Sequence, residues 1–182
     1  MPSMRSAICG LILCGVAALA VAADKPPPAE KRFALPAGKS LVIPWSAGWT
    51  DIAPPPGTPA GTVTFSGPDP AKMRVMLVPL PPDPNFTGDD GNLRILAGNI
   101  ARELENSGGE VDHEQKSIEG PNARGLYVKG IDHSPKPGEF TFIYAGPLSI
   151  DKRAYIFQIL WNAGGEAAAS NALAALKSVR IQ

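Results

Sequence analysis

The densest apolar pattern outside the N-terminus lies in the last quarter of the chain. Residues 153–161 read RAYIFQILW, and their aromatic and β-branched side chains suit the pleated surface of a strand. The run FTFIYAG at 140–146 precedes it, and residues 166–181 follow it with small apolar side chains at helical spacing. We interpret this order as strand, strand, helix. Because only Gln158 interrupts the central run after Arg153, we predict an interior strand covered on both faces.

Shorter alternating patterns predict strands in the first half of the chain. Residues 61–67 and 72–80 form a predicted hairpin, in which alternate side chains face one core. The connection Gly67-Pro68-Asp69-Pro70 has the residues that favour a turn. Residues 39–45 predict another strand, which Pro44 restricts to a sheet edge or strand end because proline cannot donate a ladder hydrogen bond. The proline-rich run at 53–61 predicts a loop.

One amphipathic helix is predicted in the middle of the chain. Asp89 or Asp90 is placed to cap it, and Gly108-Gly109 is placed to end it. Its apolar side chains recur with the spacing of a single helical face, at Leu93, Leu96, Ala97, Ile100 and Leu104. We predict a helix of about four turns that lies on a sheet.

The order of the predicted elements indicates the fold class. Residues 110–118 form a polar segment that is typical of a charged edge strand, and residues 125–131 form a further strand after a turn. Several antiparallel strands with two separate helices predict an α+β domain. We expect an antiparallel β-sheet sandwiched between helices, a three-layer α/β/α arrangement.

The N-terminal segment is typical of a secretory signal peptide. Residues 1–23 place Arg5 before an uncharged apolar run that ends in small residues, so we expect cleavage between Ala23 and Asp24. An uncleaved membrane anchor is the alternative, because the uncharged run approaches spanning length. The proline-rich residues 24–32 are predicted to be a linker, and residues 33–182 a single domain. The expected location is periplasmic or secreted, without stable membrane insertion after cleavage.

Cleavage would change the charge and the available chemistry very little. It removes both cysteines, so no disulfide framework is expected in the mature chain. It also removes Arg5, which leaves 16 basic against 17 acidic side chains. This balance gives no electrostatic reason to expect nucleic acid as a partner.

The chain resembles the PsbP-like fold family, which includes the extrinsic photosystem II protein, a nuclear Ran-binding regulator and small exported bacterial proteins. The resemblance rests on VIPWSAGW, the hairpin TVTFSG and RVMLVPLP, the helix LRILAGNIARELENSG, and the closing ALKSVRI. These motifs extend over residues 33–181. The resemblance implies an antiparallel sheet between helical layers and binding or accessory roles without catalysis. It provides no shared catalytic residues, and the proline-rich insert after Trp49 departs from the family pattern.

Candidate catalytic and metal-binding residues are sparse. His113 and His133 each have acidic neighbours, but neither has a second histidine or a cysteine at ligand spacing. No nucleophile-elbow or phosphate-loop pattern is present in the sequence. We therefore predict no catalytic residues, no metal site and no cofactor.

Aromatic side chains beside the proline-rich segments are the candidate binding residues. Trp45, Trp49 and Phe86 lie in or next to these segments, and exposed loop aromatics often anchor a ligand. The alternative for both tryptophans is that they close the end of the core. A groove formed with residues 81–86 would be the binding site.

The leading hypothesis is an exported, non-enzymatic binding or accessory domain whose partner is a protein or a small ligand. An immunity or chaperone-like partner of another exported protein is one alternative. A small hydrolase that uses carboxylates with His113 or His133 is the other.

Overall fold

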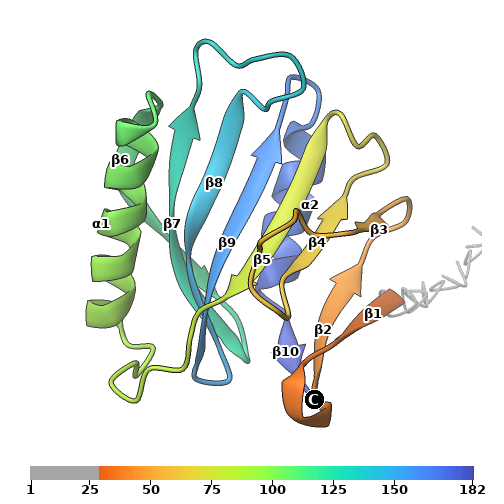
Figure 1. The fold of residues 1–182 in the computed structure, drawn as a ribbon, viewed down its shortest axis with the longest axis vertical. Helices are drawn as coiled ribbons and strands as arrows, with labels where there is room; N and C mark the ends of the chain where they lie inside the picture. Colours follow the sequence, from red (N-terminus) through yellow and green to blue (C-terminus); the bar gives the residue numbers. More distant parts are fainter. Residues whose placement is uncertain (1–28) are drawn as a thin grey trace, which may run out of the picture.

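The computed structural model describes residues 29–182. The predicted signal peptide at 1–23 and the first part of the predicted linker lie outside the described residues. Residues 29–182 form two antiparallel sheets and two α-helices, so the α+β prediction is confirmed (Figure 1). No helix in this range combines the length and apolar character needed to cross a membrane.

The larger sheet has seven strands in the order β3-β4-β5-β9-β8-β7-β6, and every neighbouring pair is antiparallel. The predicted hairpin of residues 61–67 and 72–80 is confirmed, with Phe65 opposite Val75. The strand bounds are β3 Thr50–Ile52, β4 Val63–Ser66, β5 Met73–Pro79, β6 Glu110–Glu119, β7 Ala123–Ile131, β8 Phe142–Ile150 and β9 Arg153–Trp161.

Strand β9 lies at the centre of the larger sheet, as the apolar run at 153–161 predicts. From Tyr155 onward one of its faces is buried and carries Tyr155, Phe157, Ile159 and Trp161. The other face, with Ile156, Gln158 and Leu160, is only half-buried. Complete cover on both faces was expected, and the difference arises because the first helix packs over β6, β7 and β8 instead of β9.

The smaller sheet has three strands in the order β1-β2-β10, namely β1 Ala29–Ala34, β2 Ser40–Trp45 and β10 Arg180–Ile181. The short turn η1 (Pro36–Gly38) joins β1 to β2. The linker predicted for residues 24–32 therefore ends too late, because residues 29–32 pair with β2 as part of β1. Strand β2 is central, but β10 pairs only with its residues Leu41 and Val42. Pro44 lies beyond that pairing, where its missing N–H costs little.

Helix α1 (Asp90–Asn106) begins and ends close to the predicted positions. The Asp89 carboxylate accepts a hydrogen bond from the backbone N–H of Asn92 at 2.9 Å, which caps the first turn. After the helix, Gly108 adopts φ +90°, a conformation that glycine adopts without strain. Leu93 and Ala97 are fully buried and pack with Leu126 of β7.

Helix α2 (Glu166–Leu176) packs against β9, β5 and β2, and it thereby connects the two sheets. Its buried residues are Ala169, Ala172 and Leu176, whose small volumes allow a close approach to the strands. They belong to the main core cluster together with residues of both sheets, such as Ile43 and Phe157. Figure 1 shows α2 behind β4 and β5, while α1 lies beside β6 and β7.

Candidate functional site

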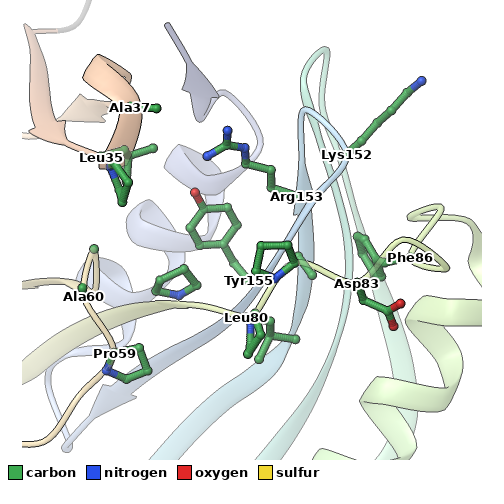
Figure 2. A pocket seen from close by; sticks show the side chains of 16 residues that line it. Leu35, Ala37, Pro59, Ala60, Leu80, Asp83, Phe86, Lys152, Arg153 and Tyr155 are labelled. Atoms are coloured by element: carbon green, nitrogen blue, oxygen red, sulfur yellow. The ribbon is translucent and has the colours of Figure 1, made fainter.

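A cavity of about 600 Å³ lies at the end of the larger sheet where β5 finishes and β9 begins. Four segments that are distant in sequence form its walls, and we call it the proline cavity (Figure 2). Its lining residues are Leu35, Pro36, Ala37, Pro59, Ala60, Gly61, Pro79, Leu80, Pro81, Pro82, Asp83, Phe86, Lys152, Arg153, Ala154 and Tyr155. Its size is within the range of about 300–1,000 Å³ that is usual for small-molecule sites.

Five prolines give the walls their character: Pro36, Pro59, Pro79, Pro81 and Pro82. Each proline fixes its own φ angle and has no backbone N–H. The walls are therefore stiff and poor in hydrogen-bond donors. An apolar ligand surface meets fewer unpaired polar groups there than in an ordinary loop-lined pocket.

Backbone hydrogen bonds hold the wall segments in place. In the loop between β3 and β4, the Pro59 carbonyl accepts hydrogen bonds from the Thr62 N–H at 3.1 Å and from its hydroxyl at 2.7 Å. The Leu80 N–H donates to the Ala154 carbonyl at 2.9 Å, which extends the β5–β9 pairing into the cavity wall. Across the cavity, the Leu35 N–H donates to the Lys39 carbonyl at 2.8 Å. The cavity is thus built into the fold of the chain as it stands.

The segment that connects β5 to α1 is packed against the sheet at its far end. Gly88 has φ +70°, and a Cβ there would lie 2.4 Å from the Ser149 hydroxyl oxygen. Only glycine fits so close to β8. The Thr87 hydroxyl donates to the Asp89 carboxylate at 2.6 Å, and the Thr87 N–H donates to the Asn92 side chain at 2.9 Å. The cap of α1 therefore also fixes one wall of the cavity.

The basic lining residues of the cavity, Lys152 and Arg153, lie in and directly after the β8–β9 turn. Asp151 and Lys152 have φ angles of +48° and +62°, the left-handed pair of a two-residue hairpin turn in which Asn-Gly or Asp-Gly is the usual choice. The Asp151 carboxylate accepts a hydrogen bond from the Ile181 N–H of β10 at 2.9 Å. This bond ties the turn to the smaller sheet and so fixes the start of β9.

Two polar side chains from β9 face the cavity. The Tyr155 ring lies among the lining residues, with its hydroxyl toward Leu35 and Arg153 (Figure 2). The Arg153 guanidinium extends over the cavity, whereas the Lys152 side chain extends away from it (Figure 2). Burial raises the pKa of the Tyr155 hydroxyl, and the positive charge of Arg153 opposes that rise. The hydroxyl is consequently a proton donor at neutral pH.

A second cavity of about 410 Å³ lies between α1 and the half-buried face of β9. It is lined by Leu80, Leu96, Asn99, Ile100, Glu103, Leu104, Ser107, Ile156 and Gln158. Leu80 lines both cavities, so the two are neighbours. Three members of the predicted apolar stripe of α1 therefore border this cavity and face β9 across it, namely Leu96, Ile100 and Leu104.

The structure separates the predicted binding residues. Trp45 and Trp49 pack together with ring centroids 5.6 Å apart, and Trp49 stacks on Phe65 at 4.9 Å. The Trp45 indole N–H donates to the Trp49 carbonyl at 3.1 Å, and Trp49 is only 7% exposed. Neither tryptophan lines the proline cavity. Both close the end of the main core, which is the alternative that the sequence left open.

Phe86 is the candidate residue that the structure does place at the cavity. It is half-buried, lines the proline cavity, and packs against Leu93 and Ala97 of α1. Its position on the long connection after β5 is the one the sequence indicated.

Both histidines lie beside carboxylates at the surface. His113 Nε2 is 2.9 Å from a Glu105 oxygen, and His133 Nε2 is 2.7 Å from a Glu110 oxygen. Within residues 29–182, neither histidine lines either cavity, and no group of three or more His, Cys, Asp or Glu side chains could hold a metal ion. The candidate bases of the hydrolase alternative thus lie outside both of these cavities.

Sequence reasoning missed most of the cavity, although one signal was available. Pro79 of β5 pairs with Tyr155 of β9, and Val63 of β4 pairs with Leu77. The start of β4, the end of β5 and the start of β9 must therefore share one end of the sheet. Proline-rich segments precede β4 and follow β5, so the hairpin prediction alone would have brought both to that end.

Comparison with known proteins identifies the fold. No protein-family model matches the chain, and no curated protein matches it. The structure is similar to the solution structure of cyanobacterial PsbP (CyanoP) from Synechocystis sp. PCC 6803, with a TM-score of 0.52 and 10% sequence identity. The match covers 84% of this chain and 91% of that chain. The PsbP-like fold is therefore confirmed, and at this identity the similarity shows the fold alone.

Proposed function

We propose that this chain is an exported, non-catalytic accessory domain that binds a small ligand in the proline cavity. The observation that carries the proposal is a cavity of about 600 Å³ whose four walls are held by hydrogen bonds of the domain itself. A preformed site spends little free energy on ordering its walls when a ligand binds. Such a site is a sound basis for a binding role.

The composition of the cavity favours binding over catalysis. Its walls are mainly proline, leucine and aromatic side chains, with Tyr155, Arg153 and Asp83 among its few polar groups. A catalytic site needs a nucleophile or base within hydrogen-bond reach of an orienting partner. The His–carboxylate pairs of the domain lie elsewhere, at the exposed ends of α1 and β6.

We also infer that the domain has the three-layer α/β/α arrangement of the resemblance. Leu126 and Tyr127 are neighbours on β7, so their side chains point to opposite faces of the sheet. Leu126 packs with α1, whereas Tyr127 packs against the main core that contains α2. The two helices would then cover opposite faces, with α1 displaced toward β6.

The proposal includes export with cleavage of residues 1–23. The supporting observation is the sequence pattern of a charged start, an apolar run and a small-residue end. Intact mass of the protein recovered from the culture medium or periplasm tests this part separately. A mass that begins at Asp24 is expected, and a mass that still includes Met1 to Ala23 would favour the membrane anchor.

The binding proposal is tested by filling the cavity from a loop. Ala60 lines the cavity and is exposed, so Ala60→Trp should occupy the space without removing any core side chain. Ala53 is an exposed residue of the same loop that does not line the cavity, and Ala53→Trp is the matched control. Nile red, a neutral dye that fluoresces in apolar sites, serves as the probe in a titration of the mature domain.

We expect wild type and Ala53→Trp to bind the dye with the same Kd within about twofold, and Ala60→Trp to bind roughly tenfold more weakly, a loss of about 1.4 kcal/mol. Equal binding by all three proteins would place the dye elsewhere and overturn the site. Loss of binding in both variants would show that any tryptophan in this loop weakens dye binding. That result would equally contradict the assignment of the dye site to the proline cavity.

A further inference from the structure

We infer that the proline cavity takes an anionic amphiphile, a hydrocarbon chain that ends in a carboxylate, with the charged head at Arg153 and the chain among the prolines. This inference rests on the proposed function, because it assigns a ligand class to the same cavity. It goes beyond that function by stating which charge the ligand carries and which end of the cavity holds it.

The first reason is the position of Arg153. Its guanidinium extends over the cavity (Figure 2). Within residues 29–182 it forms no ion pair with a carboxylate at 4 Å or less. The nearest acidic neighbour along the chain, Asp151, accepts a hydrogen bond from the Ile181 N–H at 2.9 Å and is held toward β10. The guanidinium is thus available to a ligand, and its fork of N–H groups matches a carboxylate.

The second reason is that a neutral donor lies at the same end of the cavity. The Tyr155 hydroxyl points toward Arg153, and the residue is almost completely buried (Figure 2). A carboxylate there can accept from the hydroxyl and from the guanidinium together. A cationic head would face Arg153 instead and would be repelled.

The remaining charges of the cavity do not reverse this polarity. Lys152 adds a second positive charge at the rim, although its side chain extends away from the cavity (Figure 2). Among residues 29–182, Asp83 is the one acidic residue that lines the cavity, and its carboxylate accepts a hydrogen bond from the Asn85 N–H at 2.8 Å. Figure 2 shows Asp83 beside Phe86, away from the Arg153 guanidinium. The Arg153 end is therefore the anion-binding end.

The walls explain the hydrocarbon part of the ligand. The space beyond Arg153 is bounded by Leu35, Leu80 and Phe86 and by prolines that lack backbone N–H groups. A polar chain would lose hydrogen bonds to water there and regain few of them. An alkyl chain loses none, and its burial is favourable in proportion to the apolar area removed from water.

The experiment compares octanoate, octan-1-ol and octylammonium, which share one chain and differ in head charge. Binding to the mature domain is measured by calorimetry or backbone-amide NMR at neutral pH. Wild type should bind octanoate most tightly and octylammonium least. Arg153→Gln should weaken octanoate binding by about tenfold, while the affinity for octan-1-ol should change by less than twofold. Arg153→Lys should recover part of the loss, because the charge returns without the planar fork.

Two controls make the result specific. Lys152→Gln removes the same charge from the adjacent residue and should change octanoate binding by about twofold at most, through screened long-range attraction. Lys136→Gln removes the same charge from the loop between β7 and β8, at the other end of the sheet, and should have no effect. Unfolding midpoints of all variants, measured in parallel, show that each is folded.

The outcomes separate this inference from the proposed function. If octanoate and octan-1-ol bind wild type equally, or Arg153→Gln leaves their ratio unchanged, the anionic head is refuted while the cavity remains a binding site. An equal loss in Lys152→Gln and Arg153→Gln would refute the role assigned to the Arg153 geometry. If no probe binds, and Nile red also fails to bind, both the ligand class and the binding cavity are refuted.

Discussion

The aromatic cluster at Trp45 and Trp49 and the proline cavity both lie where irregular proline-rich chain meets the ends of strands, yet they differ in how the space is filled. In the aromatic cluster, large rings pack on Phe65 at centroid distances of 5.1 and 4.9 Å and close the core. In the cavity, more than half of the lining residues are prolines, alanines or glycine. These short side chains cannot reach across, so about 600 Å³ remains between four fixed segments.

This difference shows why loop aromatics were a poor guide to the site. An indole buries a large apolar area, so a tryptophan at a strand end lowers the free energy of the folded state by packing inward. A ligand site needs the opposite, namely walls that hold their position without filling the space between them. Proline supplies such walls because its backbone is stiff and its side chain is short.

The largest effect in this comparison is expected for Trp49→Ala. Trp49 is nearly buried and stacked on Phe65, so its removal should lower the free energy of unfolding by about 3–5 kcal/mol. Urea or guanidinium unfolding measures the change. Ligand binding by the fraction that remains folded should be unaltered, because Trp49 does not line the cavity. A loss below about 1 kcal/mol would mean that the ring is not part of the core.

Leu35→Ala should have a smaller effect on stability. Leu35 is 8% exposed and belongs to the main core, but one side of it already borders the cavity. It therefore has fewer packing contacts to lose, and we expect about 2 kcal/mol, the lower end for a buried leucine. A loss as large as that of Trp49→Ala would show that Leu35 is packed on all sides and that the cavity is narrower than described.

The N-terminal cap of α1, next to the cavity, makes the stability of the domain depend on pH. Hydrogen bonds from the Thr87 hydroxyl and the Asn92 N–H lower the pKa of Asp89 below its ordinary value of 3.8. This carboxylate therefore contributes stability above the ordinary pKa, and the contribution is lost as the pH falls through the lower folded-state value.

Asp89→Asn should accordingly be less stable than wild type at neutral pH, and the difference should shrink at acid pH. Thermal midpoints measured from neutral pH down to about 2 test this expectation. Asp83→Asn is the comparison variant, since Asp83 lies on the same segment without capping the helix. A constant difference between Asp89→Asn and wild type at all pH values would contradict the role of the carboxylate charge.

The smallest effect is expected at the β8–β9 turn. Lys152 has φ +62°, which glycine adopts without strain, and Lys152→Gly creates the Asp-Gly pair favoured in this type of turn. The variant should be more stable by about 0.5–1 kcal/mol, because relief of strain exceeds the entropy that glycine loses. Octanoate binding should change by about twofold at most. Destabilisation would show that the lysine side chain has a structural role at the turn.

Local sequence patterns predicted helices and strands well where a single apolar periodicity dominated a segment. The apolar stripe predicted helix α1, with Asp89 or Asp90 as its cap and its end at Gly108-Gly109, and the structure assigns the cap to Asp89. The alternation in β4 and β5 predicted a hairpin, which is confirmed. The strand at Ala29–Ala34 was missed, because residues 24–32 are rich in proline and charge and their pairing partner lies after a turn. Only the tertiary pairing with β2 overrides that local composition.

The site was harder to predict than the fold. The buried position of Tyr155 on β9 was evident from the apolar run, but its role as a cavity wall depends on what lies at its end of the sheet. From the sequence, Arg153 is only the first residue of a predicted strand. The direction of its side chain depends on the turn at Asp151 and Lys152. Four segments from separate parts of the chain form the cavity, and no single stretch of sequence contains that information.

The central claim is that the proline cavity is a preformed ligand site, and an octanoate titration followed by backbone-amide NMR tests it most directly. We expect saturable shifts at Leu35, Ala60, Leu80 and Tyr155, one residue from each of the four walls, with Trp45 and Trp49 unaffected. Shifts confined to the tryptophan cluster, or no saturable shifts at any wall, would contradict the account.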